Sequence, residues 1–396
     1  MRAFMFLFTF FAFMLVSPSL AVNVVGYGAR GDGRTDSTAA FHRAWAAACR
    51  SARPAVVYVP RGLFLIRPVA FNGPCRSRIT FQIDGTLVAP RNIYAIGNSE
   101  FWILFYKVSG LSLQGGTIDA RGQGFWNCRT RGQNCPRGSR SLTIMHSNNV
   151  VVSGLRSFNS QTIHIAVGHS KDVKFQNVRI RAPSGSPNTD GIHVQSSMGV
   201  TITDSVIKTG DDCISLGPGA KNLWIQRIGC GPGHGISIGS LGNSHNEEGV
   251  ENVTVTNVVF SRTQNGVRVK SWGRPSGGYA RNLHFRNIVM RYVANPIIID
   301  QQYCPNGGCA RQSSGVKVSE VTYKNIRGTS STQAAIKFEC SAANPCSGIR
   351  LHNIRLSFLD RLRRPTLAYC RNAKGSHSGV VTPNTCFSFH KTKINM

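Results

Sequence analysis

The stretch Val173-Lys-Phe175-Gln-Asn177-Val178 sets a pattern that returns through most of this 396-residue chain. Its order is an apolar residue, any residue, an apolar residue, any residue, Asn and a β-branched residue. Period-two alternation of this kind is typical of a strand with one buried face. Further copies are Val253-Thr-Val255-Thr-Asn257-Val258, Leu283-His-Phe285-Arg-Asn287-Ile288, Val321-Thr-Tyr323-Lys-Asn325-Ile326 and Ile349-Arg-Leu351-His-Asn353-Ile354, with looser copies from Leu111, Val150, Val200 and Leu223.

From Val150 onward the copies start 23 to 38 residues apart, and self-similarity at such a period indicates a solenoid. Each unit holds several short strands and no convincing helix, which excludes leucine-rich and helical repeats. We therefore predict an all-β fold, a right-handed parallel β-helix whose coils stack at ~4.8 Å. The Asn of each copy is expected to hydrogen-bond along the stack as a ladder. A β-propeller is the weaker alternative, because its repeat is longer and its blades are antiparallel.

Both ends of a solenoid need a cover. Asp36-Ser37-Thr38 precedes an Ala-rich segment that carries Phe41, Trp45 and Cys49 at helical spacing. This pattern predicts an N-terminal capping helix. The tail beyond Leu359 is expected to cap the other end.

The first residues have the composition of a secretory signal. Arg2 precedes an apolar, Phe-rich run over residues 3–16, and Ser19-Leu20-Ala21 has the small-x-small form of a cleavage site. The run is short for a membrane span, and a retained anchor is the minor alternative. We predict a signal peptide over 1–21 and a single β-helical catalytic domain over 22–396. The mature protein is expected to be secreted, extracellular or in a cell wall, free of the membrane, and monomeric.

Twelve cysteines in an exported chain indicate disulfides. No C-x-x-C pair occurs, which makes a zinc site the weaker interpretation. The spacing suggests nearest-neighbour pairing that clips small loops one at a time. The expected pairs are Cys49–Cys75, Cys128–Cys135, Cys213–Cys230, Cys304–Cys309, Cys340–Cys346 and Cys370–Cys386.

The chain has 46 basic and 17 acidic residues, a formal net charge of +29. Such a field attracts polyanions. Nucleic acid fits the charge alone, but no helix-turn-helix, zinc finger or aromatic RNA-binding pattern accompanies it. The expected partner is therefore an acidic extracellular polysaccharide, with no nucleic acid.

Four clusters hold most of the reactive polar side chains. Three aspartates fall within 23 positions, and close carboxylates raise one another's pKa, so that one can stay protonated as a general acid. Spacings near one coil place the clusters on one face of the β-helix, where they predict hydrolysis of a bond in an anionic substrate. The clusters are Asn188-Thr189-Asp190, Gly210-Asp211-Asp212-Cys213, Gly233-His234-Gly235 and Arg268-Val269-Lys270.

These motifs resemble the four signatures of the polygalacturonases, glycoside hydrolase family 28. The runs Gly28–Asp36 and Asn295–Cys304 are similar to the plant members, and the resemblance covers the chain from about Asn23 to its end. It implies a right-handed parallel β-helix that hydrolyses α-1,4 bonds between galacturonic acids with inversion, without metal or other cofactor. The departures are mild: Val269 and Ser271-Trp272 in the basic motif, and the loop from Asn243 to Glu251. The loop difference leaves chain-end preference open.

The resemblance also implies roles for single residues. Asp211 is the expected general acid, with its pKa raised by flanking carboxylates. Asp190 and Asp212 would hold and deprotonate the attacking water, and His234 would support the proton arrangement. Substrate binding is expected at Asn188, at the cations Arg268 and Lys270, which share one strand face, and at Tyr303, whose alternative role is a packed aromatic beside Cys304.

Other readings of the same residues lead to other functions. The fold also suits hydrolysis of rhamnogalacturonan or xylogalacturonan, or a catalytically silent pectin-binding protein, although the intact aspartates argue against the latter. A pectate lyase would need a calcium-binding carboxylate cluster and an Arg base. The glycosylation sequon at Asn252 begins a predicted strand.

Overall fold

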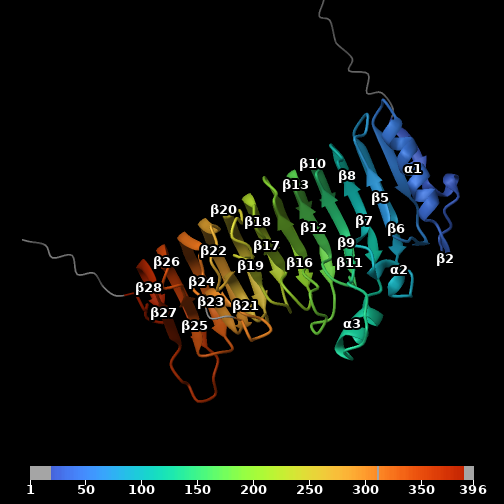
Figure 1. The fold of residues 1–396 in the computed structure, drawn as a ribbon. Coiled ribbons are helices and arrows are strands. Elements are labelled where there is room, and N and C mark those ends of the chain that lie inside the picture. The colour runs from blue at the N-terminus through green and yellow to red at the C-terminus, as the bar shows by residue number, and fades with distance from the viewer. Residues whose placement is uncertain (1–18, 310–311, 388–396) are drawn as a thin grey trace, which may run out of the picture.

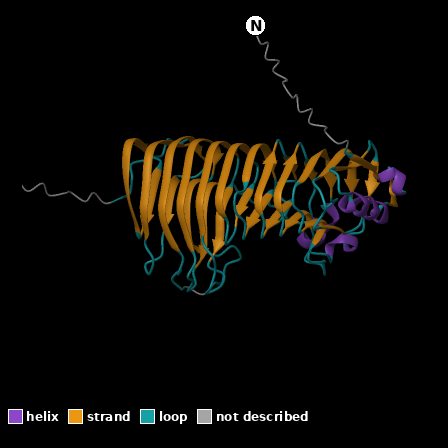
Figure 2. Ribbon diagram, turned by 90° about the horizontal axis from the view of Figure 1, so that it is seen from above, coloured by secondary structure: helices purple, strands orange, loops and turns teal. Residues whose placement is uncertain are grey.

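The structure is a computed structural model that describes residues 19–309 and 312–387, and it confirms the predicted all-β solenoid. Coils stack along one axis, with the N-terminal helices at one end and the last strands at the other (Figures 1 and 2). Every strand pairing among the described residues is parallel, as a β-helix requires; the pairings of neighbouring coils β18–β20 and β20–β22 are examples. The strands form two long sheets, here called sheet A and sheet B.

Sheet A bends within many coils, so that one coil contributes one long strand or two shorter ones. Its strands are β1 (Leu20–Asn23), β2 (Asp32–Asp36), β3 (Ala55–Val59), β4 (Leu63–Leu65), β6 (Ile79–Val88), β8 (Leu111–Asp119), β10 (Asn148–Ser153), β11 (Arg156–Phe158), β13 (Lys171–Gln176), β14 (Arg179–Arg181), β16 (Thr201–Lys208), β18 (Lys221–Cys230), β20 (Val250–Ser261), β22 (Tyr279–Val293), β24 (Lys317–Ser330), β26 (Cys346–Phe358) and β28 (Ala373–Thr382).

Sheet B takes one strand from each coil and is central to the site described below. Its strands are β5 (Val69–Asn72), β7 (Phe101–Tyr106), β9 (Arg140–Met145), β12 (Ile165–Gly168), β15 (Ile192–Gln195), β17 (Ile214–Leu216), β19 (Ile236–Leu241), β21 (Asn265–Trp272), β23 (Asn295–Tyr303), β25 (Ala334–Glu339) and β27 (Leu367–Arg371). The helices are η1 (Val24–Tyr27), α1 (Thr38–Arg50), α2 (Tyr94–Gly97) and α3 (Gln123–Thr130).

The repeated apolar positions form the core. The second apolar residue of each copy pairs in register with its equivalent one coil away, so these side chains form one buried column. Burial of such a column supplies most of the driving force for folding. The column comprises Val152, Phe175, Ile202, Ile225, Val255, Phe285, Tyr323 and Leu351.

The repeated Asn residues occupy the bend in sheet A. Asn287, Asn325 and Asn353 have φ between 52° and 56°, in the left-handed region that Asn tolerates better than most residues. Their amides bond along the stack, with Asn325 donating to Asn287 at 3.1 Å and Asn353 to Asn325 at 3.4 Å. The expected ladder is confirmed here. Asp204 and Arg227 replace it with an ion pair in two earlier coils.

The N-terminal cap is also confirmed. Helix α1 buries Phe41 and Trp45 against the first coils, and Trp45 lies 5.2 Å from Phe71 between ring centroids. The first turn is capped by Asp36, whose Oδ1 accepts from the Thr38 amide at 3.0 Å, while the Ser37 side chain makes no capping bond to the helix. Because α1 covers the open end of the stack, the first coil is shielded from water.

The tail beyond Leu359 differs from a simple cap. Strands β27 and β28 add one more coil to the two sheets, and Phe387 stacks on Phe338 at 5.8 Å. Six disulfides join the nearest-neighbour pairs named above.

Most of the expected signal peptide, residues 1–18, lies outside the described residues. Strand β1 starts at Leu20 and pairs with β3, so cleavage after Ala21 would leave Val22 and Asn23 in that pairing. No helix among the described residues is both long enough and apolar enough to cross a membrane.

Candidate active site

Sheet B brings the four sequence clusters to one side of the solenoid. Asp190 precedes β15, Asp211 and Asp212 precede β17, and His234 precedes β19. The register pairs Ile192 with Ile214 and Ile214 with Ile236. Asp190, Asp212 and His234 each lie two residues before these paired positions and are therefore equivalent in three successive coils, with Asp211 one residue earlier.

Close backbone contacts between coils explain several residues of the motifs. Thr189 is buried, and its Oγ1 accepts from the Gly210 amide at 3.0 Å, which ties the first cluster to the second. A Cβ on Gly210 would lie 2.0 Å from the Ser186 carbonyl oxygen, and a Cβ on Gly235 would lie 2.2 Å from that of Asn265. The glycine after His234 therefore accommodates the next coil's backbone.

Asp212 is fully buried and is surrounded by positive charge. Its Oδ1 accepts from Arg268 Nη2 at 2.9 Å and from Ser237 Oγ at 2.8 Å, and its Oδ2 accepts from Lys270 Nζ at 2.9 Å. Arg268 Nε also donates to Ser237 Oγ at 2.9 Å. A buried carboxylate is stable only when it is paired and hydrogen-bonded in this way. In the free protein both expected substrate-binding cations are therefore held by Asp212.

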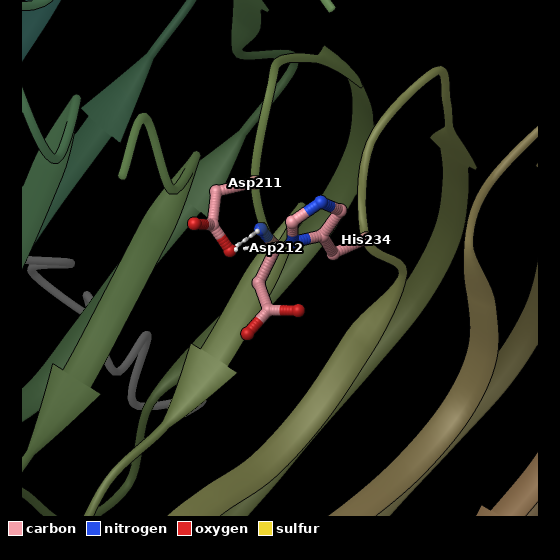
Figure 3. A group of neighbouring side chains, drawn as sticks. All are labelled: Asp211, Asp212 and His234. Carbon is pink, nitrogen blue, oxygen red and sulfur yellow. Dashed lines mark hydrogen bonds and ion pairs between the residues drawn. The ribbon is translucent and has the colours of Figure 1, made fainter. Parts of the chain in front are cut away.

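Asp211 has a different partner from its neighbour in the chain. Its Oδ1 lies 3.0 Å from His234 Nδ1 and accepts from the Asp212 amide at 2.7 Å (Figure 3). The Asp211 side chain is 18% exposed, whereas that of Asp212 is 1% exposed. Of these two carboxyls, Asp211 is the more accessible to a ligand on the surface.

Asp190 completes the group of carboxyls. Its Oδ2 accepts from Ser215 Oγ at 2.7 Å, and the same hydroxyl bonds His193 Nδ1 at 2.8 Å. Burial, and after it the charges of Asp211 and Asp212, raise the pKa of Asp190 to about 7. Asp190 is therefore protonated at acidic pH in the free protein.

The pKa values correct one expectation about Asp211. Burial raises the pKa of Asp211, but the hydrogen bond and the charge of His234 outweigh burial and hold this pKa below its ordinary value. The same bond raises the pKa of His234. The raised carboxyl pKa expected at Asp211 is found at Asp190, because Asp190 is deeper and has no cation in hydrogen-bond contact.

Tyr303, at the end of β23, lies beside both cations. Its ring centroid is 5.0 Å from Lys270 Nζ and 5.7 Å from the Arg268 guanidinium carbon, and it meets the Trp272 ring edge-on at 5.2 Å. Tyr303 also lines a pocket of about 670 Å³ that continues toward the C-terminal coils. The other lining residues include Gln302, Glu339 and Arg371. Tyr303 thus occupies the border between the cation pair and this pocket.

Two expected residues lie apart from this network. Asn188 is exposed and has a φ of 54° on the turn before Asp190. Asn252 lies on sheet A, where its amide nitrogen donates to Asn222 at 2.9 Å and its oxygen accepts from Asn282 at 2.6 Å. The nitrogen that a glycan would modify therefore takes part in a second amide ladder.

Sequence reasoning missed three polar residues of the site: His193, Ser215 and Ser237. Ser215 and Ser237 both follow an Ile in the repeated run Ile-Ser, one coil apart, and they pair in register on the outer face of sheet B. Each is the second residue of its strand and lies close in the chain to a motif residue, and this position could have identified both as site residues. Burial lowers the pKa of His193, which favours a neutral imidazole there.

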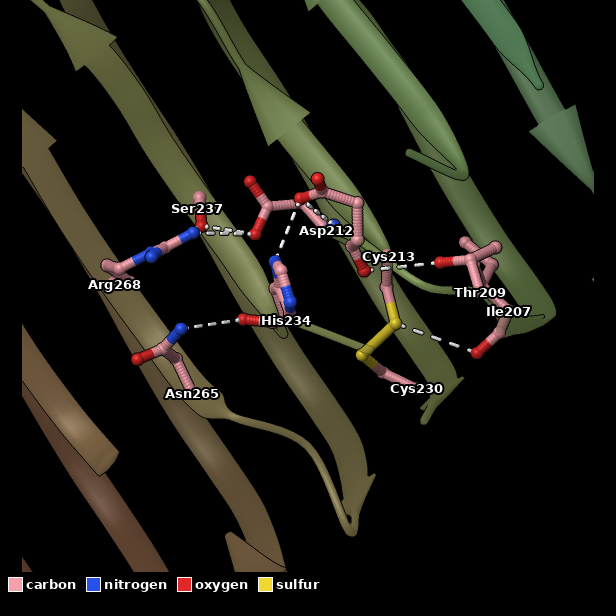
Figure 4. The surroundings of a disulfide bond; sticks show 10 residues. Ile207, Thr209, Asp212, Cys213, Cys230, His234, Ser237, Asn265 and Arg268 are labelled. Carbon is pink, nitrogen blue, oxygen red and sulfur yellow. Dashed lines mark hydrogen bonds and ion pairs between the residues drawn. A yellow bond between two sulfur atoms is a disulfide. The ribbon is translucent and has the colours of Figure 1, made fainter. Parts of the chain in front are cut away.

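The Cys213–Cys230 disulfide fixes the coil that carries the two adjacent aspartates (Figure 4). Cys213 is fully buried and directly follows Asp212, and the bond ties the start of β17 to the end of β18. Asn265 supports the next coil by donating from Nδ2 to the His234 carbonyl at 3.1 Å. The acidic turn is thus restrained from both sides.

One group of potential metal ligands overlaps this site. Asp211, Asp212 and His234 each offer a ligand atom, and these atoms lie within 4.8 Å of one another. Both oxygens of Asp212 already accept from cationic side chains. A divalent ion would add positive charge next to Arg268 and Lys270, so the group suits proton transfer better than metal binding.

A parallel β-helix with carboxyls, an imidazole and two cations on one sheet face fits the class of enzymes that act on acidic polysaccharides. The family model of glycosyl hydrolases family 28 matches residues 49–381. A polygalacturonase of Prunus persica is 52% identical over 95% of this chain and 96% of its own length. An exopolygalacturonase of Platanus acerifolia is 44% identical over 91% and 96%.

Among solved structures, the hyperthermoactive exopolygalacturonase of Thermotoga maritima superimposes with a TM-score of 0.70 at 19% identity, over 91% of each chain. At this identity the likeness concerns the fold. The family model and the plant relatives together establish that this chain belongs to glycosyl hydrolases family 28.

Proposed function

We propose that this protein is a polygalacturonase that hydrolyses α-1,4-galacturonosidic bonds of de-esterified homogalacturonan with inversion of configuration. The observation that carries the proposal is the meeting of the Asp211–His234 pair and the Asp212–Arg268–Lys270 group on one sheet face. The names of the plant relatives agree with this activity.

Asp211 is the proposed general acid. It is more exposed than Asp212, and its hydrogen bond with His234 gives it a partner that can share a proton. In the free enzyme the carboxyl with the raised pKa is Asp190, partly because Asp211 lies close to it. The proton that Asp190 carries at acidic pH must be on Asp211 when the glycosidic oxygen is in place, so the reaction requires its transfer between these two neighbouring carboxyls.

Asp190 and Asp212 are the proposed residues that hold and deprotonate the attacking water. Arg268 and Lys270 hold both oxygens of Asp212 by hydrogen bonds, and transfer of the proton of Asp190 to Asp211 leaves Asp190 ionised. An inverting enzyme needs its acid and base far enough apart, ~6.5–9.5 Å, for a water molecule to fit between them. Of the two proposed bases, Asp190 lies one coil before Asp211, whereas Asp212 lies in the same coil as Asp211.

Arg268 and Lys270 are the proposed ligands of a galacturonate carboxylate. Lys270 uses one of its three N–H donors on Asp212, and Arg268 uses two of its five on Asp212 and Ser237. The remaining donors, next to the Tyr303 ring, are available to a substrate. Because both side chains are pre-positioned by Asp212, little side-chain entropy is lost on binding.

The domain and location expectations are part of the same proposal. A signal peptide over 1–21, a single catalytic domain over 22–396 and a monomer in the extracellular space or cell wall suit an enzyme whose substrate is a wall polymer. The six disulfides are consistent with an oxidising compartment.

The test is digestion of polygalacturonic acid by purified protein, with proton NMR of the first product. We expect reducing ends to appear and the new anomeric centre to be β before mutarotation. An α product would overturn the inverting mechanism, and turnover of xylogalacturonan in place of polygalacturonic acid would overturn the substrate. A steep early drop in viscosity would assign internal cleavage.

A further inference from the structure

A second basic region lies on the outer face of sheet A, away from the carboxyl cluster of sheet B. It is formed by β22, β24 and β26, and we call its six exposed cations the basic face: Arg286, Arg291, Lys324, Arg327, Arg350 and Arg355. Register places Arg286 beside Lys324, and Arg327 beside Arg355. Adjacent parallel strands bring such side chains to a spacing of ~4.8 Å.

Acidic residues neutralise other cations of sheet A but not these. Arg227 pairs with Asp204, and Arg281 pairs with Glu251. Among the ion pairs of the described residues, none includes a member of the basic face. Glu320, the one acidic residue of the three strands, lies at their other end near Arg281. Six like charges held together cost free energy unless an anion offsets them.

Two further observations concern the side chains of the basic face. The guanidinium of Arg286 lies over the half-exposed Trp224 ring, with its carbon 5.4 Å from the centroid, which holds it flat against the sheet. His284 lies between the cations, and burial followed by the charges of Arg286 and Arg350 lowers its pKa. The His284 imidazole is therefore protonated less readily than a free one, which limits the repulsion it adds to the face.

A groove crosses the same three coils at the bend in sheet A. It has a volume of about 390 Å³ and is lined by Arg327, Arg355 and the ladder amides of Asn287, Asn325 and Asn353. Because the ladder runs from coil to coil, the groove follows the axis of the solenoid. Guanidinium groups suit carboxylates, and amides suit hydroxyls, so the lining matches a linear polymer of acidic sugars.

We propose that the basic face and this groove form a second binding surface for homogalacturonan, which holds the polymer while another segment or chain occupies sheet B. The inference rests on the proposed function for the identity of the polymer. It predicts that the surface contributes to affinity for long chains and contributes nothing to cleavage of oligomers too short to reach sheet A.

The test compares two triple variants of equal charge change, both in full-length protein. One replaces Lys324, Arg327 and Arg355 by Gln; the control replaces Arg53, Arg61 and Arg76, exposed arginines near the N-terminal end, by Gln. Binding of long polygalacturonate is measured in the Asp211→Asn background at low salt. We expect affinity to fall about tenfold in the first variant and less than about twofold in the control.

Kinetics of the active forms complete the experiment. The basic-face variant should lose kcat/KM on long polygalacturonate and keep that of wild type on galacturonate trimer. Equal binding of polygalacturonate by the two triple variants would overturn the inference. Binding of duplex DNA is measured in parallel: a basic-face variant that loses DNA binding and keeps galacturonan binding would also overturn it. Failure of wild type to hydrolyse galacturonan would overturn the proposed function instead, while the binding comparison would still decide whether this surface exists.

Discussion

Asp211 and Asp212 are adjacent in the chain, yet their carboxyls have separate partners. Asp211 bonds His234 at 3.0 Å, whereas Asp212 is buried between Arg268 and Lys270 at 2.9 Å from each. One residue of offset thus produces a more exposed carboxyl beside an imidazole and a buried carboxyl fixed by cations. Substitution at the two positions should therefore have different consequences.

Asp211→Asn should abolish hydrolysis and leave folding intact. The amide keeps the size of the side chain but cannot donate the proton that the leaving oxygen needs, a loss of at least ~10²–10⁴ in rate. Activity and thermal unfolding of the variant should be measured together. Near-normal turnover by the folded variant would remove Asp211 from the acid role. Asp212→Asn is the contrasting change, because it also removes the charge that Arg268 and Lys270 face, and it should lower Tm.

The contribution of Asp190 to stability should fall as the pH rises from about 4 to 7, whereas the lowered pKa values of buried His164 and His193 act in the opposite direction. The folded pKa of Asp190, about 7, lies above its unfolded value, so the folded state binds the extra proton throughout this window. The raised pKa of His234 acts in the same direction near the top of the window. One proton corresponds to at most ~1.4 kcal/mol of unfolding free energy per pH unit.

Urea unfolding of wild type and Asp190→Asn at pH 4.5 and 7.5 checks this dependence. The free energy of unfolding of wild type relative to Asp190→Asn should be lower at pH 7.5 than at pH 4.5, since the amide does not titrate and the histidines contribute equally to both proteins. Ser215→Ala is a useful companion, because the Ser215 hydroxyl bonds the Asp190 carboxylate and its loss should move the dependence to still higher pH. An identical pH dependence in wild type and Asp190→Asn would mean that folding does not raise the pKa of Asp190.

The sequence allowed prediction of the solenoid because each coil repeats the same local choices. Alternating apolar residues such as Val253 and Val255 bury one strand face, and the Asn that follows them adopts the left-handed bend. The sequence signal for the capping helix is also local, since Phe41 and Trp45 are one helical turn apart and fall on one face. Such signals need only neighbours in the chain.

The proton arrangement was not predictable in the same way. Lys270 and Asp212 are 58 residues apart, and only the register of β17, β19 and β21 makes them an ion pair. The pKa of each aspartate depends on burial and on which cation reaches it, and neither quantity can be read from a motif. Ser237 was not predicted as a site residue, because its role depends on its pairing with Arg268 in the next coil.

Ser237→Ala should lower both stability and activity. The Ser237 hydroxyl donates to Asp212 and accepts from Arg268, so its loss leaves a buried charged group with one partner fewer. Hydrogen bonds to charged groups contribute ~1.5–3 kcal/mol. Unfolding free energy and kcat should be compared with those of Ser376→Ala, an exposed serine on β28. Equal stability in the two variants would contradict a supporting role for Ser237.

Removal of the Cys213–Cys230 disulfide should destabilise the protein by ~3 kcal/mol, as expected for a loop of this length. The paired change Cys213→Ala with Cys230→Ala avoids a free thiol next to Asp212. The matched control removes Cys304–Cys309, which closes a shorter loop of exposed residues and should cost less. Thermal unfolding of both double variants gives the comparison, and a larger loss from the control pair would contradict it.

The cation pair should recognise the charge of the substrate. If Arg268 and Lys270 bind a sugar carboxylate, Arg268→Ala and Lys270→Ala should each weaken transition-state binding by ~2–5 kcal/mol. Methyl esterification removes the same charge from the substrate side, so wild type should lose most of its activity on highly esterified pectin. The variants should lose proportionally less, because the group that esterification would unpair is already absent.

Steady-state kcat/KM on de-esterified and esterified polymer, for wild type and each variant, forms a double cycle. Each substitution also takes a partner from Asp212, and that damage is present with either polymer. It therefore cancels in the ratio between substrates, and the remaining coupling reports contact with the carboxylate alone. Loss of long-range attraction at high salt should appear in wild type and variants alike, since the net charge of +29 changes little. An equal penalty from esterification in wild type and both variants would show that these cations act only on Asp212.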